Sequence, residues 1–333
     1  MGRSRIVSIL LVAVLLAAGC QNPGADEDDG SLRRIVYLTA FGATGRDAFA
    51  WVAQEKGYFR DAGLDVEIRL GAALSDNMRT LAAGRADFMN SDLIGGVISA
   101  GQGTFTGFRV FAAIHQQSLV SIVTPADGPI KKPADLAGKR LGAATASVNQ
   151  VLFPAYAKAT GLDPAGVTWV NAAPAQVPAL LASGRVDALC TFLIGRPGIE
   201  AAAGKQMTVL PFSDALPDTF GNALTTSASL AESDPDLVRR FRDAALRGLA
   251  DTLADPRAAA ELLHERNPAS TVAAAEGEIT LMAPLTTPTG GGPLGSIDRD
   301  RLTRAIAMLT DAGLFAPGLT ADEVVAFPLT PGS

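Results

Sequence analysis

The feature that most constrains the fold of this chain is a short pattern that occurs twice, one hundred positions apart. The sequence reads LAAGRAD at 81–87 and LASGRVD at 181–187. Each copy closes a longer series in the same order: a helix, Gly-Leu-Asp, a strand, a loop, a second helix, Gly-Arg-x-Asp and a second strand. One glycine that ends a helix is common, whereas the same order of elements over about thirty residues is not. The repeat predicts two similar α/β lobes with largely parallel sheets and helices on both faces.

The repeated residues themselves favour a structural role. Gly84 and Gly184 are predicted to follow helix ends in the left-handed conformation, where glycine avoids a Cβ clash. Asp87 and Asp187 begin strands, and we expect them to cap backbone N–H groups locally. We therefore predict that neither aspartate contacts a ligand.

Most of the remaining elements follow from hydrophobic periodicity and capping residues. A helix is predicted at 47–59, with Asp47 as its N-cap and Gly57 as its end. Residues 123–147 join the lobes, and from 224 onward the sequence is predicted to be helical. Predicted strands lie at 33–41, 64–70, 86–90, 139–144, 167–171 and 186–192, and further helices begin at 145, 234, 255, 298 and 320.

The N-terminus indicates export. Arg3 and Arg5 precede an apolar run at 6–18 that would span about 20 Å as a helix, which is too short for a bilayer core of about 30 Å. A charged start, a short apolar core and small residues are typical of a secretory signal. The run closes with LAAGC, which resembles the lipobox of bacterial lipoproteins, so residues 1–19 are predicted to be a signal peptide and Cys20 to carry lipid.

Composition restricts the partners of the exported chain. Residues 20–33 are rich in Pro, Gly and acidic residues, and they read as a flexible tether. Without Arg3 and Arg5 the chain has 26 basic and 34 acidic residues, a net charge of −8, which argues against nucleic acid as a partner. Cys190 is the one cysteine besides Cys20, and its apolar surroundings predict a small buried side chain rather than a nucleophile.

Several stretches in order resemble one known family. They are AWVAQEKGYFRDAGLDVEI (50–68), LAAGRADF, KKPADLAGKRLGAATAS, ALLASGRVDAL and PDLVRRFRDAALRGL. Together, over roughly 34–325, they resemble the type II periplasmic binding proteins of the nitrate, sulfonate, taurine and thiamine-pyrimidine group. The first stretch is the most specific one.

The resemblance implies a two-lobed α/β fold in which the chain crosses twice between lobes. Lobe 1 would comprise 34–123 with 224–333, and lobe 2 would comprise 124–223. It also implies a monomeric extracytoplasmic receptor of an ABC importer, held at the membrane by Cys20, with a permease and an ATPase as partners and no cofactor. Such lobes close over a ligand that lies beyond the carboxyl ends of the strands.

That rule selects the loops at 41–47, 71–77, 90–93, 143–149, 171–176 and 192–196 as candidates for the cleft. Asn90, Ser91 and Asp92 directly follow a strand, and they either point to a ligand or form an Asx turn. Thr145 and Ser147 lie at a predicted helix start, where capping and ligand binding are compatible.

The other candidates are aromatic, amide or charged residues. Phe41 and Phe192 either stack on a ligand ring or pack in the core, and the same alternatives apply to Trp51. Asn222 is a neutral candidate beside the second crossing. Arg46 either pairs with an anionic substrate or is a solvated loop charge.

Few charges and several Phe, Asn, Ser and Thr residues in these loops favour a small heterocycle such as a thiamine pyrimidine precursor. A sulfonate, taurine or nitrate bound near Thr145 is the alternative. An enzyme similar to the fungal-type pyrimidine synthases would need a reactive histidine and a Cys-rich iron site, but the chain has only His115 and His264 and no cysteine cluster. We therefore predict no catalytic residue and no metal, and a sensor subunit without transport stays open.

Overall fold

The computed structural model describes residues 32–145, 147–288 and 290–332, which form one compact unit. Cys20 and the predicted signal peptide lie outside the described residues, as does the tether up to position 31. None of the described helices is both long and apolar enough to cross a membrane. The described strands form two separate five-stranded sheets.

The first sheet has the order β2-β1-β3-β10-β4. Strands β2 and β3 are parallel to β1, whereas β10 runs antiparallel to both of its neighbours. The strand β10 was not predicted, because the sequence from 224 was expected to be helical. The bounds are β1 (Arg33–Leu38), β2 (Leu64–Arg69), β3 (Phe88–Asp92), β4 (Phe108–Ala113) and β10 (Asn222–Ser227).

The second sheet repeats this plan with the order β7-β6-β8-β5-β9. Here β5 is the antiparallel strand, at the position that β10 holds in the first sheet. Each sheet therefore receives its antiparallel strand directly after the chain arrives from the other sheet. The bounds are β5 (Val120–Pro125), β6 (Arg140–Ala144), β7 (Thr168–Ala172), β8 (Ala188–Phe192) and β9 (Met207–Pro211).

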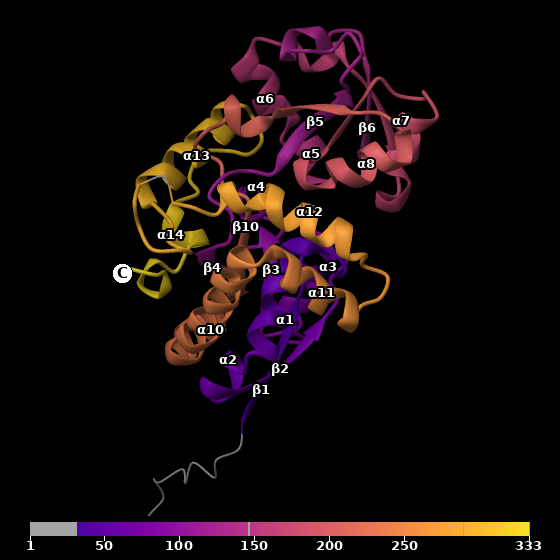
Figure 1. Ribbon diagram of the computed structural model, residues 1–333. Helices are drawn as coiled ribbons and strands as arrows, with labels where there is room; N and C mark the ends of the chain where they lie inside the picture. The colour runs from indigo at the N-terminus through magenta and orange to yellow at the C-terminus, as the bar shows by residue number, and fades with distance from the viewer. Residues whose placement is uncertain (1–31, 146, 289, 333) are drawn as a thin grey trace, which may run out of the picture. The chain divides into compact units, whose positions relative to one another are not determined.

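Helices flank both sheets, and the C-terminal helices return to the first sheet (Figure 1). The predicted helix from 145 to 161 is divided at Leu152, because Pro154, in the first turn of the new helix, lacks the N–H that would continue the old one. The helices are α1 (Ala48–Glu55), α2 (Tyr58–Asp61), α3 (Leu74–Ala82), α4 (Leu93–Gly101), α5 (Val148–Val151), α6 (Phe153–Thr160), α7 (Val177–Ala182), α8 (Arg196–Ala203), α9 (Ala228–Ser233), α10 (Pro235–Ala254), α11 (Pro256–Arg266), α12 (Val272–Met282), α13 (Arg299–Asp311) and α14 (Ala321–Val324).

The two copies of the repeated pattern occupy the same place in the two sheets. Gly84 follows α3 with φ 65°, and Gly184 follows α7 with φ 68°. A Cβ at either position would meet no atom within 4 Å, so the left-handed backbone alone requires glycine. The predicted helix-end role of both glycines is confirmed.

The sequence predicted that the repeated aspartates cap backbone N–H groups locally. In the structure they connect neighbouring strands instead. The Asp87 carboxylate accepts from the Val36 N–H at 2.8 Å, while the Asp87 N–H donates to the Val36 carbonyl at 2.9 Å. Asp187 makes the same pair of bonds with Arg140, at 2.8 and 2.9 Å. In each sheet the aspartate thus joins the start of one parallel strand to the neighbouring strand: β3 to β1 through Asp87, and β8 to β6 through Asp187.

The chain changes sheet at 114–119 and again at 212–221, a few residues before Thr124 and the 222–226 segment, which lie in strands. A buried arginine of α13 joins these two crossings. The Arg301 guanidinium donates to the carbonyls of Gln116, Pro217 and Thr219, the last two at 3.0 and 3.1 Å. It also lies 4.1 Å from the centre of the Phe220 ring, and Arg301 is only 6% exposed.

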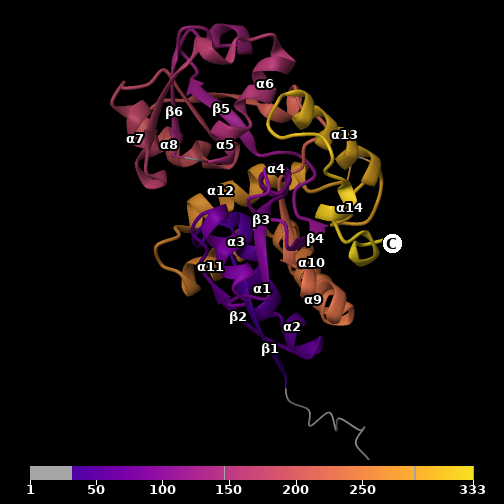
Figure 2. The ribbon, with the colours of Figure 1, turned by 180° about the vertical axis from the view of Figure 1, so that it is seen from behind.

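One hydrophobic cluster includes Met89 of the first sheet, Ile122 of the second sheet and Leu302 of α13. Helix α13 lies beside α6 of the second sheet in both ribbon views (Figures 1 and 2), and Lys158 donates to the Asp311 carbonyl there. The sheets are thus joined by a continuous core as well as by two crossings.

Candidate binding site

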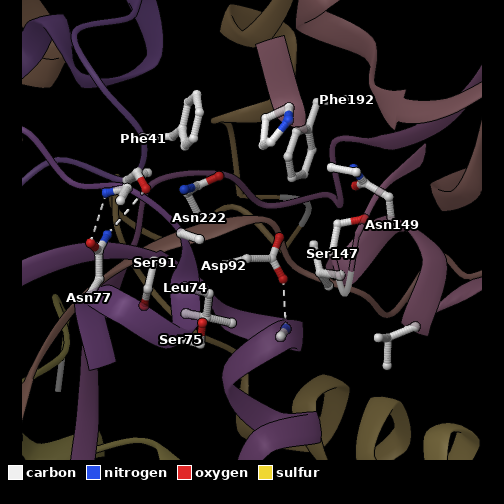
Figure 3. Close-up of a pocket in the computed structure, with 18 of the residues that line it drawn as sticks. Phe41, Leu74, Ser75, Asn77, Ser91, Asp92, Ser147, Asn149, Phe192 and Asn222 are labelled. Carbon is white, nitrogen blue, oxygen red and sulfur yellow. Dashed lines mark hydrogen bonds between the residues drawn. The ribbon is translucent and has the colours of Figure 1, made fainter. Parts of the chain in front are cut away.

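A cavity of about 670 Å³ lies between the two sheets at the carboxyl ends of their parallel strands (Figure 3). All six loops selected from the sequence contribute lining residues. So do α4, the segment after it, and α12 of the C-terminal part. The lining comprises Ala40, Phe41, Thr44, Arg46, Ala72, Ala73, Leu74, Ser75, Asn77, Asn90, Ser91, Asp92, Gly95, Ile98, Ser99, Gln102, Thr104, Phe105, Ala144, Thr145, Ser147, Val148, Asn149, Val151, Pro174, Val177, Thr191, Phe192, Ile194, Gly195, Asn222 and Glu278.

Nine of the ten candidate ligand-binding residues line this cavity. Trp51 does not, because its side chain lies inside α1 in the core beneath the first sheet, with 6% of its surface exposed. The nine that the fold brings together are Phe41, Arg46, Asn90, Ser91, Asp92, Thr145, Ser147, Phe192 and Asn222.

Two phenyl rings from different sheets lie on either side of the cavity. Figure 3 shows Phe41 on one side and Phe192 on the other, with Asn222 and Asp92 below and between them. Phe41 is 41% exposed, so its ring is accessible from the cavity. The Arg46 guanidinium carbon lies 5.1 Å from the centre of the Phe192 ring, a cation–π contact that joins the two lobes.

Two buried carboxyl groups, Asp47 and Asp92, and the partly buried Glu278 lie within electrostatic reach of Arg46. Burial raises the pKa of Asp92 to about 6, and it also raises the pKa values of Asp47 and Glu278, while the charge of Arg46 opposes each shift. Glu278 comes from α12 and accepts from the Gly45 N–H at 2.6 Å. Helix α12 therefore brings an acidic group to the cavity that the sequence analysis missed, because the contact depends on tertiary packing alone.

Asp47 is not the side-chain cap that the sequence predicted, since its carboxylate makes no capping bond to α1. It is fully buried, and it accepts from the Tyr37 hydroxyl at 3.1 Å, the Ala40 N–H at 3.2 Å and the Asn90 Nδ2 at 2.9 Å. The bond to Asn90 fixes the orientation of that amide, so its Oδ1 points away from Asp47. Asp47 is thus a positioning residue for the wall of the cavity.

Asn77 was also missed, and it positions two loops of the cavity. Its Nδ2 donates to the Thr39 and Ala40 carbonyls at 3.1 and 3.2 Å, and its Oδ1 accepts from the Ala72 N–H at 3.1 Å. An asparagine in the first turn of a helix after a glycine-containing loop is the only signal the sequence offers for this role.

His115 is buried near the second crossing. Its Nδ1 accepts from the Asn222 N–H at 3.2 Å, and its Nε2 lies 3.3 Å from the Met282 sulfur. Burial and the charge of Arg46 lower the pKa of His115 to about 3, so the imidazole is neutral. It fixes the start of β10, and Asn222 with it, rather than facing the cavity.

The cavity wall carries an unusual number of polar atoms that lack a partner. Among the described residues, eight buried side-chain nitrogen or oxygen atoms have no hydrogen bond, and seven of them belong to the lining. Such groups cost about 1–3 kcal/mol each when they stay unpaired, so native proteins contain few of them. Their concentration here indicates a surface that is completed by a polar ligand. The seven atoms are Thr44 Oγ1, Arg46 Nε, Asn90 Oδ1, Asp92 Oδ2, Ser147 Oγ, Asn149 Oδ1 and Asn222 Oδ1.

Two curated proteins are similar to most of this chain. The formylaminopyrimidine-binding protein of Halalkalibacterium halodurans is 26% identical over 261 residues, which is 78% of each chain. The riboflavin-binding protein RibY of Chloroflexus aurantiacus is 23% identical over 279 residues, 79% of this chain and 78% of RibY.

Solved structures share the fold. The periplasmic aliphatic sulphonate binding protein SsuA of Escherichia coli matches with a TM-score of 0.69 and 15% identity, over 89% of this chain and 92% of SsuA. The desulfurization enzyme DSZB matches with a TM-score of 0.58 and 18% identity, over 89% and 97%. These structures confirm the predicted two-lobed periplasmic-binding-protein fold, and one of them is an enzyme, so the fold does not decide the function.

The sequence model of one family, described as NMT1/THI5 like, matches residues 47–259. This is more than half of the 333 residues, and it spans the second sheet, both crossings and every strand of the first sheet except β1. It includes Asn90, Asp92, Phe192 and Asn222 of the cavity wall. The chain therefore belongs to the NMT1/THI5-like family.

Proposed function

We propose that the protein is the extracytoplasmic solute-binding receptor of an ABC importer, which encloses a small heterocycle between its lobes and delivers it to a permease. The observation that carries the proposal is the cavity between the sheets, where seven unpartnered polar atoms converge. The curated relatives are named for binding a formylaminopyrimidine and riboflavin, and both ligands are planar heterocycles with polar edges.

The wall of the cavity favours a heterocycle over a sulfonate. Phe41 and Phe192 offer two aromatic faces, which suits a flat ring inserted between them. The alternative site for an anion was the helix start after Thr145, but α5 has only four residues, and so small a helix supplies little positive potential at its N-terminus. Among the described residues Arg46 is the one cation of the lining, and the buried Asp47 and Asp92 and the partly buried Glu278 lie within its electrostatic reach.

The same geometry supports binding rather than catalysis. The Cys190 thiol is fully buried and donates to the Asn149 carbonyl at 3.2 Å, and burial raises the pKa of this thiol, which disfavours a thiolate nucleophile. His115 is neutral and committed to Asn222. Neither group can act as a base at a ring held between the two phenylalanines.

A ligand panel tests the proposal. Purified protein that begins at Leu32 is titrated by calorimetry with aminopyrimidines, riboflavin, alkanesulfonates, taurine and nitrate. We expect saturable binding of at least one heterocycle, and Phe41→Ala should weaken it by about two- to tenfold through the loss of one stacking surface. Phe41→Leu keeps apolar area without the ring and serves as the matched control. Binding of sulfonates alone would contradict the heterocycle proposal.

We further propose that lipid on Cys20 holds the protein at the outer face of the cytoplasmic membrane. The LAAGC sequence and the acidic tether after it support this proposal. Expression of Cys20→Ser should shift the protein from the membrane fraction to the medium or the periplasm. Unchanged membrane retention of that variant would contradict lipid anchoring.

A further inference from the structure

We propose that Asp92 and Asn90 form a specificity-determining pair that selects ligands with N–H donors along one edge, such as an amino-substituted heterocycle, and rejects the corresponding oxo analogue. The inference rests on the proposed function, because it assigns the chemistry of one wall of the same cavity. It adds which edge of the ring is recognised and by which atoms.

The pair is created by the geometry of β3. Successive side chains of a strand alternate between faces, so residues 90 and 92 project from the same face of the sheet. Ser91 lies between them in sequence and bonds to the Thr225 hydroxyl at 2.8 Å. The side chains of Asn90 and Asp92 both reach the cavity, and Figure 3 shows Asp92 near its centre.

Both side chains are deeply buried and present an oxygen without a partner. Asn90 is 0% exposed and Asp92 is 8% exposed. The unpartnered atoms are Asn90 Oδ1 and Asp92 Oδ2. A buried acceptor that gains no hydrogen bond is costly, and the cost is larger for a charged carboxylate.

Local contacts fix which atoms face the ligand. The Asn90 Nδ2 is engaged by Asp47 at 2.9 Å, so the amide presents its oxygen. The Asp92 Oδ1 accepts from the Gly95 N–H at 2.7 Å as the N-cap of α4, so Oδ2 is left over. The Asn90 amide cannot turn its Nδ2 toward the ligand without breaking the bond to Asp47, and an ionised Asp92 carboxylate has acceptors only.

Two such acceptors require donors from the ligand. The two N–H bonds of one exocyclic amino group supply them, and a hydrogen bond to a carboxylate is among the strong ones. A carbonyl or a sulfonate oxygen at the same place would meet two acceptors of like polarity. Arg46, whose Nε is also unpartnered, supplies a donor to a different part of the ligand, so an acceptor elsewhere on the ring is compatible.

The test compares a 4-aminopyrimidine with the 4-oxo pyrimidine that carries the same substituents, by calorimetric titration of wild-type protein and of Asp92→Asn. We expect wild type to bind the amino compound at least about tenfold more tightly. In Asp92→Asn the cap to Gly95 keeps the amide oxygen in place, and the new NH₂ group faces the cavity. The preference should fall at least about tenfold and shift toward the oxo compound.

Asp234→Asn is the matched control. Asp234 caps α10 by accepting from the Leu237 N–H at 3.0 Å, and it is not part of the cavity lining. The same chemical change there should leave the amino-to-oxo ratio unchanged. Circular dichroism of all three proteins establishes that they are folded, and the wild-type ratio tests the inference independently of any variant.

The outcomes separate the two proposals. If wild type binds neither pyrimidine nor riboflavin, the proposed heterocycle receptor is wrong. If wild type binds both pyrimidines equally, or if Asp92→Asn leaves the ratio as it was, the inference is overturned while the proposed function stands. An effect of equal size in Asp234→Asn would also overturn it.

Discussion

At the scale of single residues, the cavity wall contains polar side-chain atoms that have no hydrogen-bond partner within the described part of the protein. Asp92 is the clearest case, since burial raises the pKa of its carboxyl from 3.8 to about 6. A carboxyl with a raised folded-state pKa contributes stability that is fully present below the unfolded pKa. That contribution is lost as the pH rises through the folded pKa.

This sign gives a prediction for Asp92→Asn in the absence of ligand. Between pH 4 and pH 8 the wild type should lose about 2–3 kcal/mol that the variant does not lose. The variant keeps the cap, because asparagine caps about as well as aspartate. Urea unfolding of both proteins at pH 4, 5, 6 and 8 should show the variant gaining relative stability as the pH rises. A difference that is constant with pH would contradict the shifted pKa.

How far single residues could be predicted depends on what places them. The rule of carboxyl strand ends needs only strand positions, and it led to Asn90, Asp92 and Phe192. It could not find Glu278, because α12 reaches the cavity through packing against distant elements. Trp51 was ambiguous for a related reason: sequence shows that a helix carries an aromatic residue, but not which face of the helix meets the core.

At the scale of elements, each repeated aspartate links two strands of its sheet, and the contribution of this link to stability can be measured. Removal of the Asp87 carboxylate leaves the Val36 N–H of β1 without its acceptor, and Asp187 has the same role toward Arg140. We expect Asp87→Ala and Asp187→Ala each to destabilise the protein by about 1–2 kcal/mol, as measured by urea unfolding. Because the sites lie in different sheets, the double variant should be close to additive.

The repeated arginines supply the control for this prediction. Arg85 and Arg185 occupy matching positions of the two copies, and both are exposed. Their replacement by alanine should change the free energy of unfolding by about 0.5 kcal/mol or less. Equal effects of the arginine and aspartate variants would show that the carboxylates are not the structural part of the repeat.

The element most resistant to prediction was β10. Its partners β3 and β4 precede it by more than one hundred positions, so nothing local specifies the pairing. Its counterpart β5 has the same antiparallel place in the other sheet, and Thr226 and Thr124 donate to the carbonyls of Asp87 and Asp187 at 2.8 and 3.2 Å. The two sheets are therefore alike beyond the repeated sequence, because β10 and β5 hold matching places although they lie outside the repeat.

At the scale of the whole molecule, Arg301 connects α13 to both crossings. Arg301→Met should leave three carbonyls without their donor, two of them in buried bonds, and cost about 3 kcal/mol or more. Arg304→Met on the same helix removes an exposed pair with Asp218 and should cost less than about 1 kcal/mol. Urea unfolding of the two variants checks this difference. Similar losses in the free energy of unfolding would show that the buried bonds of Arg301 stabilise the protein no more than the exposed ion pair of Arg304.

The same three bonds restrict how the lobes could separate to admit a ligand. If the two crossings stay fastened at Arg301, that point acts as a pivot, and opening becomes a rotation with small displacements near Arg301 and larger ones at the mouth of the cavity. Phe41 and Phe192 would then travel far, whereas Asn222, at the end of the second crossing, would hardly move. Admission and release would be governed by the two rings, and Asn90, Asp92 and Asn222, which all belong to the first sheet, would stay together throughout the cycle.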